Sequence, residues 1–159
     1  MAGWSFEVRK ATIDDAEDIH QITKEAFEKY IELAGIHHKI AALEETIEDI
    51  IHDIQTKEVF VACIDGIAVG SARIQVFEDH TAYLSRFGVR LNYQNIGVGK
   101  TIMNVVDMAM KELGVKKLYL HTASKAFSLV RFYYGRGFYI DSTTKDRGYI
   151  RALLCKEYE

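Results

Sequence analysis

The stretch over residues 94–101, Gln-Asn-Ile-Gly-Val-Gly-Lys-Thr, has the residue types and spacing of a phosphate-binding loop. It follows an apolar run and leads into a segment with apolar residues at helical spacing, so a helix begins directly after a glycine-bearing turn. The first amides of a helix have no partner within the helix, and the helix dipole places partial positive charge there. Because Gly97 and Gly99 leave room for a phosphate to reach those amides, we expect a phosphorylated cofactor here.

The spacing of the glycines separates this loop from two familiar phosphate motifs. A Walker A loop ends in Gly-Lys-Ser/Thr, as residues 99–101 do, but it needs a glycine where Gln94 stands. The following strand also offers no acidic residue to hold magnesium, which disfavours a nucleotide-hydrolysing P-loop protein. A dinucleotide fingerprint needs a third glycine where Ile102 stands. The pattern that fits is Gln/Arg-x-x-Gly-x-Gly/Ala, with Gln94, Gly97 and Gly99 in place.

A second motif lies downstream, where residues 132–138 read Phe-Tyr-Tyr-Gly-Arg-Gly-Phe. Together the two motifs resemble the pyrophosphate loop and a late element of the GNAT superfamily of acetyl-CoA-dependent N-acetyltransferases. The resemblance extends from Phe6 to about Glu157 and is sharpest between Tyr83 and Phe138. It implies acetyl-CoA as the acyl-donor co-substrate, a small amine or peptide as the acceptor, and a possible homodimer.

The resemblance also implies which residues contact acetyl-CoA. A backbone amide at the end of the strand before the loop should stabilise the oxyanion, and the loop should hold the pyrophosphate. The expected cofactor-binding residues are Phe87, Gly88, Val89, Gln94, Asn95, Ile96, Gly97, Val98, Gly99, Lys100 and Thr101. Gly88 is consistent with close backbone approach or a bulge, and equally with simple tolerance at a twisted position.

By its position in the second motif, Tyr133 is the expected catalytic residue. Acetyl transfer from a thioester to an amine needs a proton for the departing thiolate, and a tyrosine pKa of ~10 lies close to the ~8.5 of a thiol. The alternative is that Tyr133 is a core aromatic, because it shares helical spacing with Leu129 and Val130. Tyr134 would face elsewhere and is the reserve candidate.

The general base is not identified by the sequence. Many relatives carry a glutamate early in the strand before the loop, and the corresponding place here falls near Tyr83 and Ser85. The other candidates, which could act through a chain of waters, are Glu78, Asp79, His80 and His121. The missing glutamate motivates an alternative function, that of a non-catalytic acyl-CoA-binding module.

Other residues that could carry chemistry have weaker indications. By the resemblance, the segment from Phe27 and Tyr30 through Ile31 to the loop at Gly35 lines the acceptor pocket, although both aromatics could equally be core residues. The pair at 37–38, His-His, has no ligand partners at metal-binding spacing, so we expect no metal.

The chemistry requires elements that bring these segments together. Turn signals and apolar runs predict strands over 6–10, 58–64, 68–76, 82–89, 117–121, 138–141 and 149–156. Helical periodicity extends over 16–30, before a break at Gly35, over 47–54, and over 102–113, before a C-cap at Gly114, and a fourth helix is expected over 126–134. The order indicates an α/β (α+β) fold with a mostly antiparallel mixed sheet of about seven strands, one β-α-β crossover and about four flanking helices. The resemblance adds that the strands over 82–89 and 117–121 splay apart to admit the cofactor.

Composition restricts the class of protein. The 159 residues are expected to form one N-acetyltransferase domain over 1–159, with apolar and charged fractions of 48% and 27% that are typical of globular proteins. A net charge of −3 argues against nucleic acid as a partner. No apolar run approaches the ~20 residues of a membrane span, and residues 1–10 lack a signal-peptide core, so a cytoplasmic location is expected. Two cysteines make no disulfide framework.

Overall fold

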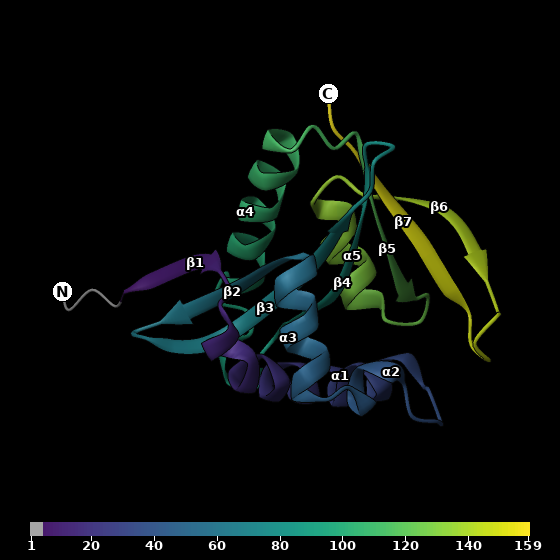
Figure 1. Cartoon of the computed structure of the whole chain (residues 1–159). Coiled ribbons are helices and arrows are strands. Elements are labelled where there is room, and N and C mark those ends of the chain that lie inside the picture. The colour runs from purple at the N-terminus through teal and green to yellow at the C-terminus, as the bar shows by residue number, and fades with distance from the viewer. Residues whose placement is uncertain (1–4) are drawn as a thin grey trace.

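The computed structural model describes residues 5–159, which form one seven-stranded sheet with helices on both faces (Figure 1). Residues 1–4, part of the segment searched for a signal peptide, lie outside the described range. The strands, in the sheet order β1-β2-β3-β4-β5-β7-β6, are β1 (Phe6–Lys10), β2 (Glu58–Ile64), β3 (Ile67–Val76), β4 (Thr81–Val89), β5 (Lys117–Ala123), β7 (Arg151–Glu157) and β6 (Tyr139–Thr144). All neighbours pair antiparallel except β4 and β5. The predicted fold class is confirmed.

Five α-helices accompany the sheet within residues 5–159, one more than predicted. They are α1 (Ala16–Ala34), α2 (Ala41–Glu44), α3 (Ile47–Thr56), α4 (Val98–Glu112) and α5 (Phe127–Gly135). The additional helix is α2, which has four residues and therefore too few turns to produce a periodic pattern. None of the helices among residues 5–159 has the length and apolar character needed to cross a bilayer.

Local signals in the sequence account for where most elements begin and end. Gly35 ends α1 in a left-handed conformation with φ 66°, as a C-terminal glycine commonly does. Asp65 and Gly66 both have positive φ, which a two-residue hairpin turn between β2 and β3 requires. The Thr46 hydroxyl accepts a hydrogen bond from the Asp49 amide at 3.1 Å and caps α3.

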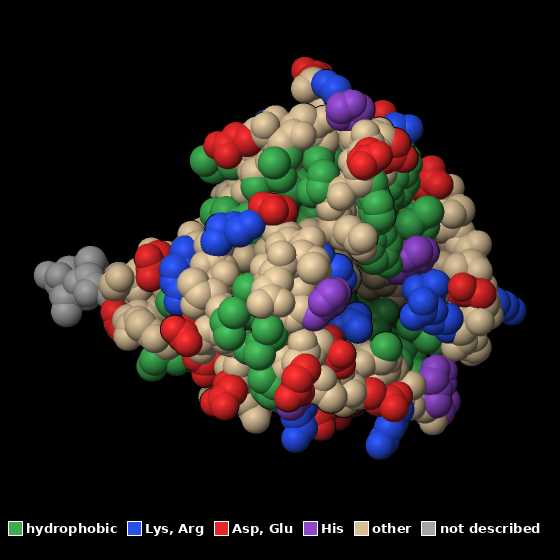
Figure 2. All heavy atoms as spheres, in the orientation of Figure 1, with side chains coloured by type: hydrophobic (Ala, Val, Ile, Leu, Met, Phe, Trp, Pro, Cys, Tyr) green, Lys and Arg blue, Asp and Glu red, His purple; other side chains and the backbone are tan. Residues whose placement is uncertain are grey.

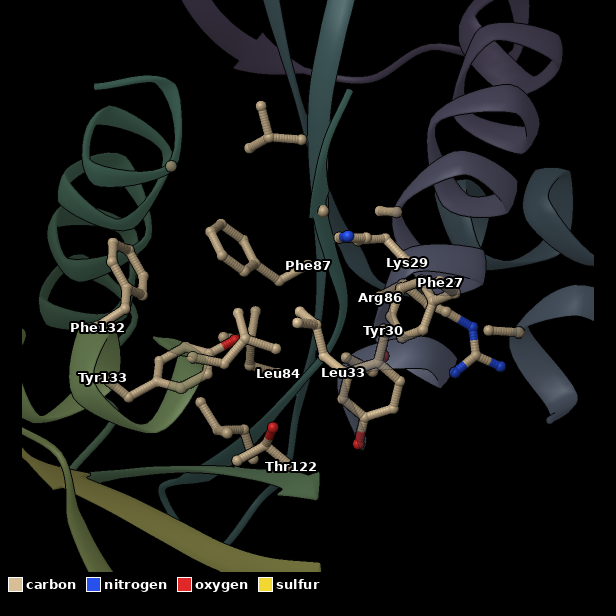
Figure 3. A pocket seen from close by; sticks show the side chains of 18 of the residues that line it. Phe27, Lys29, Tyr30, Leu33, Leu84, Arg86, Phe87, Thr122, Phe132 and Tyr133 are labelled. Atoms are coloured by element: carbon tan, nitrogen blue, oxygen red, sulfur yellow. The ribbon is translucent and has the colours of Figure 1, made fainter. Parts of the chain in front are cut away.

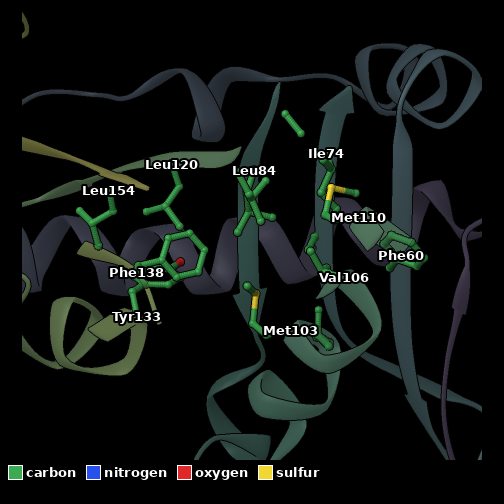
Figure 4. Packing of buried hydrophobic residues seen from close by; sticks show 14 of the residues in the cluster. Phe60, Ile74, Leu84, Met103, Val106, Met110, Leu120, Tyr133, Phe138 and Leu154 are labelled. Carbon is green, nitrogen blue, oxygen red and sulfur yellow. The ribbon is translucent and has the colours of Figure 1, made fainter. Parts of the chain in front are cut away.

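The two faces of the sheet are covered by different helices. Along β2, Val59 packs with Ile19 of α1 and Ile50 of α3. Its neighbour Phe60 points to the opposite face and belongs to the larger cluster that includes Met103 of α4 (Figure 4). Because successive side chains of a strand point to opposite faces, this alternation explains why β2 is apolar at nearly every position.

The sheet opens between β4 and β5. These strands pair only over Thr81–Tyr83 with Lys117–Tyr119, which confirms the splay that the family resemblance implied. On its other side β4 bulges away from β3, because the register shifts by one residue and Arg86 takes a positive φ of 53°. Gly88 fits a close approach of α1, since a Cβ there would lie 2.6 Å from the Cβ of Ala26. The opening and the bulge together shape the site.

Candidate active site

A pocket of about 810 Å³ lies where β4 and β5 diverge. Residues of α1, α5, the glycine loop and the loop between β6 and β7 line it. Figure 3 shows Phe132 and Tyr133 on one side of this pocket and Tyr30 and Arg86 on the other, with Phe87 of β4 between them. The space-filling view, in the orientation of Figure 1, shows a hollow in the molecular surface with Lys or Arg and His side chains at its rim (Figure 2). Segments far apart in the sequence therefore meet in one cavity.

The glycine loop forms one part of the lining. Gly97 caps α4 with φ 92° and Asn95 has φ 63°, so both residues adopt left-handed backbone that turns the chain into the helix. The Gln94 amide group donates to the Val89 carbonyl at 3.2 Å and ties the loop to the end of β4. At Gly99 a Cβ would lie 3.1 Å from the Phe87 ring, so glycine allows the start of α4 to approach this ring.

Most of the predicted cofactor-binding residues line this pocket. They are Phe87, Gly88, Val89, Gln94, Asn95, Gly97, Gly99 and Lys100. Three others do not: Ile96 is exposed, Val98 is buried in the core, and Thr101 donates its hydroxyl to the Gly97 carbonyl at 2.9 Å. The first amides of α4 lack partners within the helix, so they and Lys100 could hold a phosphate.

Tyr133 enters the pocket from α5 within an aromatic cluster. Its ring centroid lies 5.5 Å from Phe138, 5.5 Å from Phe132 and 6.1 Å from Phe87. Its hydroxyl has no hydrogen-bond partner among residues 5–159, and burial, with a smaller contribution from Tyr30, raises its pKa. Tyr133 is thus both a core residue and a pocket residue. The adjacent Tyr134 is 51% exposed and does not line the pocket.

A tyrosine–histidine pair lies in the same pocket. The Tyr83 hydroxyl oxygen is 2.6 Å from His121 Nδ1, and both residues line the cavity. The pKa of His121 is lowered, first by burial and then by the positive charges of Arg151 and Arg147. Burial raises the pKa of Tyr83. At neutral pH the imidazole therefore favours its uncharged form, which can accept a proton.

The other candidates for the general base lie elsewhere. Glu78, Asp79 and His80 belong to the turn before β4 and do not line the pocket. Asp79 is occupied locally, because its carboxylate accepts hydrogen bonds from the hydroxyl and amide of Thr81 at 2.6 and 3.1 Å. The sequence placed His121 among four candidates but gave no sign of its contact with Tyr83, which depends on strand pairing.

The expected acceptor side is only partly formed by the segment that the resemblance indicated. Phe27 and Tyr30 line the pocket, whereas Ile31 and Gly35 do not. The Tyr30 hydroxyl accepts a hydrogen bond from the Ala123 amide at 2.7 Å, and burial raises its pKa to about 12. The sequence did not single out the loop between β6 and β7, which contributes further lining residues.

A buried ion cluster supports this side of the pocket. Arg73 of β3 is fully buried and binds the Glu45 carboxylate at 2.5 and 2.9 Å and Asp53 at 2.9 Å. Arg86 reaches the same Glu45 at 3.3 Å. Because a buried charge is costly without partners, the cluster fixes the segment between α2 and α3 against the sheet. Sequence reasoning missed it, since its members lie 20 and 28 residues apart.

Comparison with known proteins agrees with this geometry. The sequence profile of the Acetyltransferase (GNAT) family matches residues 16–138. The spermidine N(1)-acetyltransferase of Thermoplasma acidophilum is 27% identical over 153 residues, which cover 87% of this chain and 91% of the relative. The crystal structure of the PaiA N-acetyltransferase of Thermoplasma acidophilum in complex with coenzyme A superposes with a TM-score of 0.85 at 22% identity, over 97% of this chain and 99% of that one. The ribosomal-protein-S18-alanine N-acetyltransferase of Escherichia coli gives a TM-score of 0.78 at 16% identity, over 96% and 94%.

Proposed function

We propose that this chain, which belongs to the acetyltransferase (GNAT) family, moves the acetyl group of acetyl-CoA to a primary amine that attacks directly while both substrates are bound. The chain is an acyltransferase, and acetyl-CoA is its co-substrate. The observation that carries the proposal is one pocket that joins the glycine loop, Tyr133 and the Tyr83–His121 pair. Neither cysteine lines this pocket, which disfavours a route through an acetylated cysteine.

The residues of the cofactor side suit a pyrophosphate. We expect the first amides of α4 and the Lys100 ammonium to bind its oxygens, with Gly97 and Gly99 leaving the approach open. On β4 the bulge leaves Arg86 and Phe87 without a paired residue on β3. A backbone amide in this part of β4 is therefore available to stabilise negative charge on the carbonyl oxygen. Acetyl-CoA supplies the acetyl group as a thioester.

His121 is the proposed general base. In the tautomer whose Nδ1–H donates to the Tyr83 oxygen, Nε2 is unprotonated and can take a proton from the substrate ammonium. Tyr83 then acts as a positioning residue, because it fixes both the ring orientation and the tautomer. This assignment weakens the case for a non-catalytic acyl-CoA-binding module, since the pocket offers a base in place of the missing glutamate.

Tyr133 is the proposed general acid that protonates the departing thiolate. Its raised pKa keeps the hydroxyl protonated before the reaction. A thiolate that forms in the same apolar surroundings also has its pKa raised by desolvation, so the two groups stay comparable as proton donor and acceptor. The free hydroxyl and the position in the pocket support this role over a purely structural one.

A turnover assay tests the proposed function. Purified protein is incubated with acetyl-CoA and a panel of primary amines, and the release of free thiol is measured together with the acetylated amine. The proposal expects thiol release that depends on an amine and matches the acetylated product one to one. Tight binding of acetyl-CoA without any transfer would instead support the acyl-CoA-binding module.

A further inference from the structure

The charged residues that line the pocket are all basic. Among the described residues, no Asp or Glu lines it, whereas Lys29, Arg86, Lys100, Arg147 and Arg151 do. Lys100 belongs to the glycine loop, whereas the other four come from α1, β4, β7 and the loop before β7. We propose that the acetyl acceptor is an amine that also carries a carboxylate, which binds this basic lining. The inference rests on the proposed function and narrows its substrate class.

Two of these arginines have little compensation from the protein. Arg147, in the loop between β6 and β7, has no carboxylate within 4 Å among residues 5–159. Arg151, the first residue of β7, is 8% exposed, and its Nε has no hydrogen-bond partner. Within the described part of the chain, the one carboxylate that its guanidinium reaches is that of Asp146 at 3.3 Å, which is 55% exposed on the loop before β7. A planar guanidinium matches the geometry of a carboxylate, so these residues suit that ligand.

The two arginines act on the place where the amine would react. Both positive charges contribute to the lowered pKa of His121, so they lie close enough for their field to reach the proposed base. A carboxylate bound by them would therefore hold an attached amine beside the Tyr83–His121 pair. The same field repels any further ammonium group of a substrate.

This electrostatic character separates the chain from an enzyme built for polyamines. A polyamine keeps additional positive charges after one amine has reacted, and these need carboxylates for partners. The nearby carboxylates Glu45 and Asp53 are already bound to the buried Arg73. The relative that carries the name spermidine N(1)-acetyltransferase is 27% identical, a likeness that does not specify the charges of this pocket.

Pairs of substrates that differ only in the carboxylate test the inference. The pairs are lysine and cadaverine, ornithine and putrescine, and 4-aminobutyrate and propylamine, with spermidine added as the polyamine. In the pairs that the enzyme accepts best, we expect kcat/KM to be about 10- to 100-fold higher for the amine with a carboxylate than for its partner without one. Hydrogen bonds to charged groups contribute free energies of this size in other proteins. Isothermal titration of the CoA-loaded protein with each member measures the same preference without turnover.

A matched pair of variants locates the effect. Arg147→Gln should remove most of the preference by lowering kcat/KM for the carboxylated amines while changing it little for their partners. Lys145→Gln removes the same charge from an exposed residue of the same loop that does not line the pocket, and it should leave the preference intact. Arg147→Glu should shift the preference toward cadaverine and putrescine.

The outcomes separate this inference from the proposed function. Acetylation of the diamines or spermidine at or above the rate of the amino acids overturns the inference and leaves acetyl transfer standing. An unchanged preference in Arg147→Gln also overturns it. If acetyl-CoA binds but no amine of the panel is acetylated or bound, both the proposed function and the inference fail.

Discussion

The cofactor side and the acceptor side of the pocket are built in different ways. The cofactor side comes largely from one continuous stretch, residues 94–101, and the first turn of α4. The acceptor side is assembled from α1, the bulge of β4, β5 and the loop between β6 and β7, and its members extend from Phe27 to Arg151. One side is therefore encoded by a local motif, and the other by tertiary contacts.

This difference has a physical origin. A phosphate site needs only unpaired amides, small residues and a helix N-terminus, all of which a few consecutive residues supply. Recognition of an acceptor needs charges and hydrogen-bonding groups converging from several directions, and these groups come together only after the sheet has formed. We expect substitutions on the cofactor side to act on acetyl-CoA and to have the larger effects. Substitutions on the acceptor side should each lower activity by a smaller amount that differs from residue to residue.

Gly97→Asp should have the largest effect. It places a negative charge at the start of α4, where the pyrophosphate is expected, in a position with φ 92° and open space around it. A ligand at about 100 times its Kd stabilises a protein by ~2.7 kcal/mol, and we expect this gain from acetyl-CoA to vanish in a thermal-shift titration. Gly97→Ala carries the same backbone strain without the charge, and it should keep most of the stabilisation by acetyl-CoA. A full gain in folded Gly97→Asp would show that the phosphate site is misassigned.

Tyr133→Phe should follow in magnitude. The substitution removes one hydroxyl from the aromatic cluster and preserves the packing of the ring with Phe132 and Phe138. General acids contribute about 10²–10⁴-fold, so kcat should fall within that range while the affinity for acetyl-CoA changes far less. Tyr134→Phe is the matched control on the exposed side of α5 and should be nearly silent. Equal activity of Tyr133→Phe and wild type would leave Tyr133 as a core residue.

The sequence was sufficient where structure follows from neighbouring residues. The strands, four of the five helices and the glycine loop depend on periodicity and on turn residues such as Gly35 and Asp65-Gly66. The family and the fold class, which were inferred from such local motifs and from the order of the elements, are confirmed by comparison with known proteins. The single-domain assignment for residues 1–159, the homodimer and the site roles stay predictions.

The sequence was insufficient where a role depends on distant partners. Tyr83 and His121 lie 38 residues apart, and only the pairing of β4 with β5 brings them together. Arg73 is the one charged residue of β3, and its burial is explained only by Glu45 and Asp53, which bind it from other elements. The importance of Arg147 depends on which other charges line the cavity, a property that no local motif contains.

His121→Asn should have a smaller effect than the loss of the general acid. We expect kcat to fall toward the lower end of the range for general bases, about 10²-fold, because water can still accept the ammonium proton. Tyr83→Phe should cost less, since it leaves the imidazole in place and removes only the group that positions it. His80→Asn, in the exposed turn before β4, is the control and should have wild-type kcat. Loss of activity in that control, with His121→Asn unaffected, would move the base from β5 to the turn before β4.

The smallest predicted effect is a shift in pH dependence that connects the two arginines to the base. The groups that act on His121 are Tyr83 on β4, Arg151 on β7, and Arg147 and Asp146 on the loop before it. Burial and the arginines lower the pKa of His121 below its usual 6.5. The base is therefore already neutral at pH 6.5, and the acid limb of the kcat profile should lie below pH 6.5. Removal of one positive charge in Arg147→Gln should raise this pKa and move the limb to higher pH.

This shift should be small, because Arg147 is exposed and its charge is screened by salt. Raising the ionic strength should therefore reduce the difference between the variant and the wild type, whereas Lys145→Gln should show no comparable shift. The pH profile of kcat for each protein, measured at low and high salt, checks both expectations. A limb that moves to lower pH in Arg147→Gln, or that survives unchanged in His121→Asn, would contradict the assignment of His121 as the base. The acceptor side would then need another group to receive the proton.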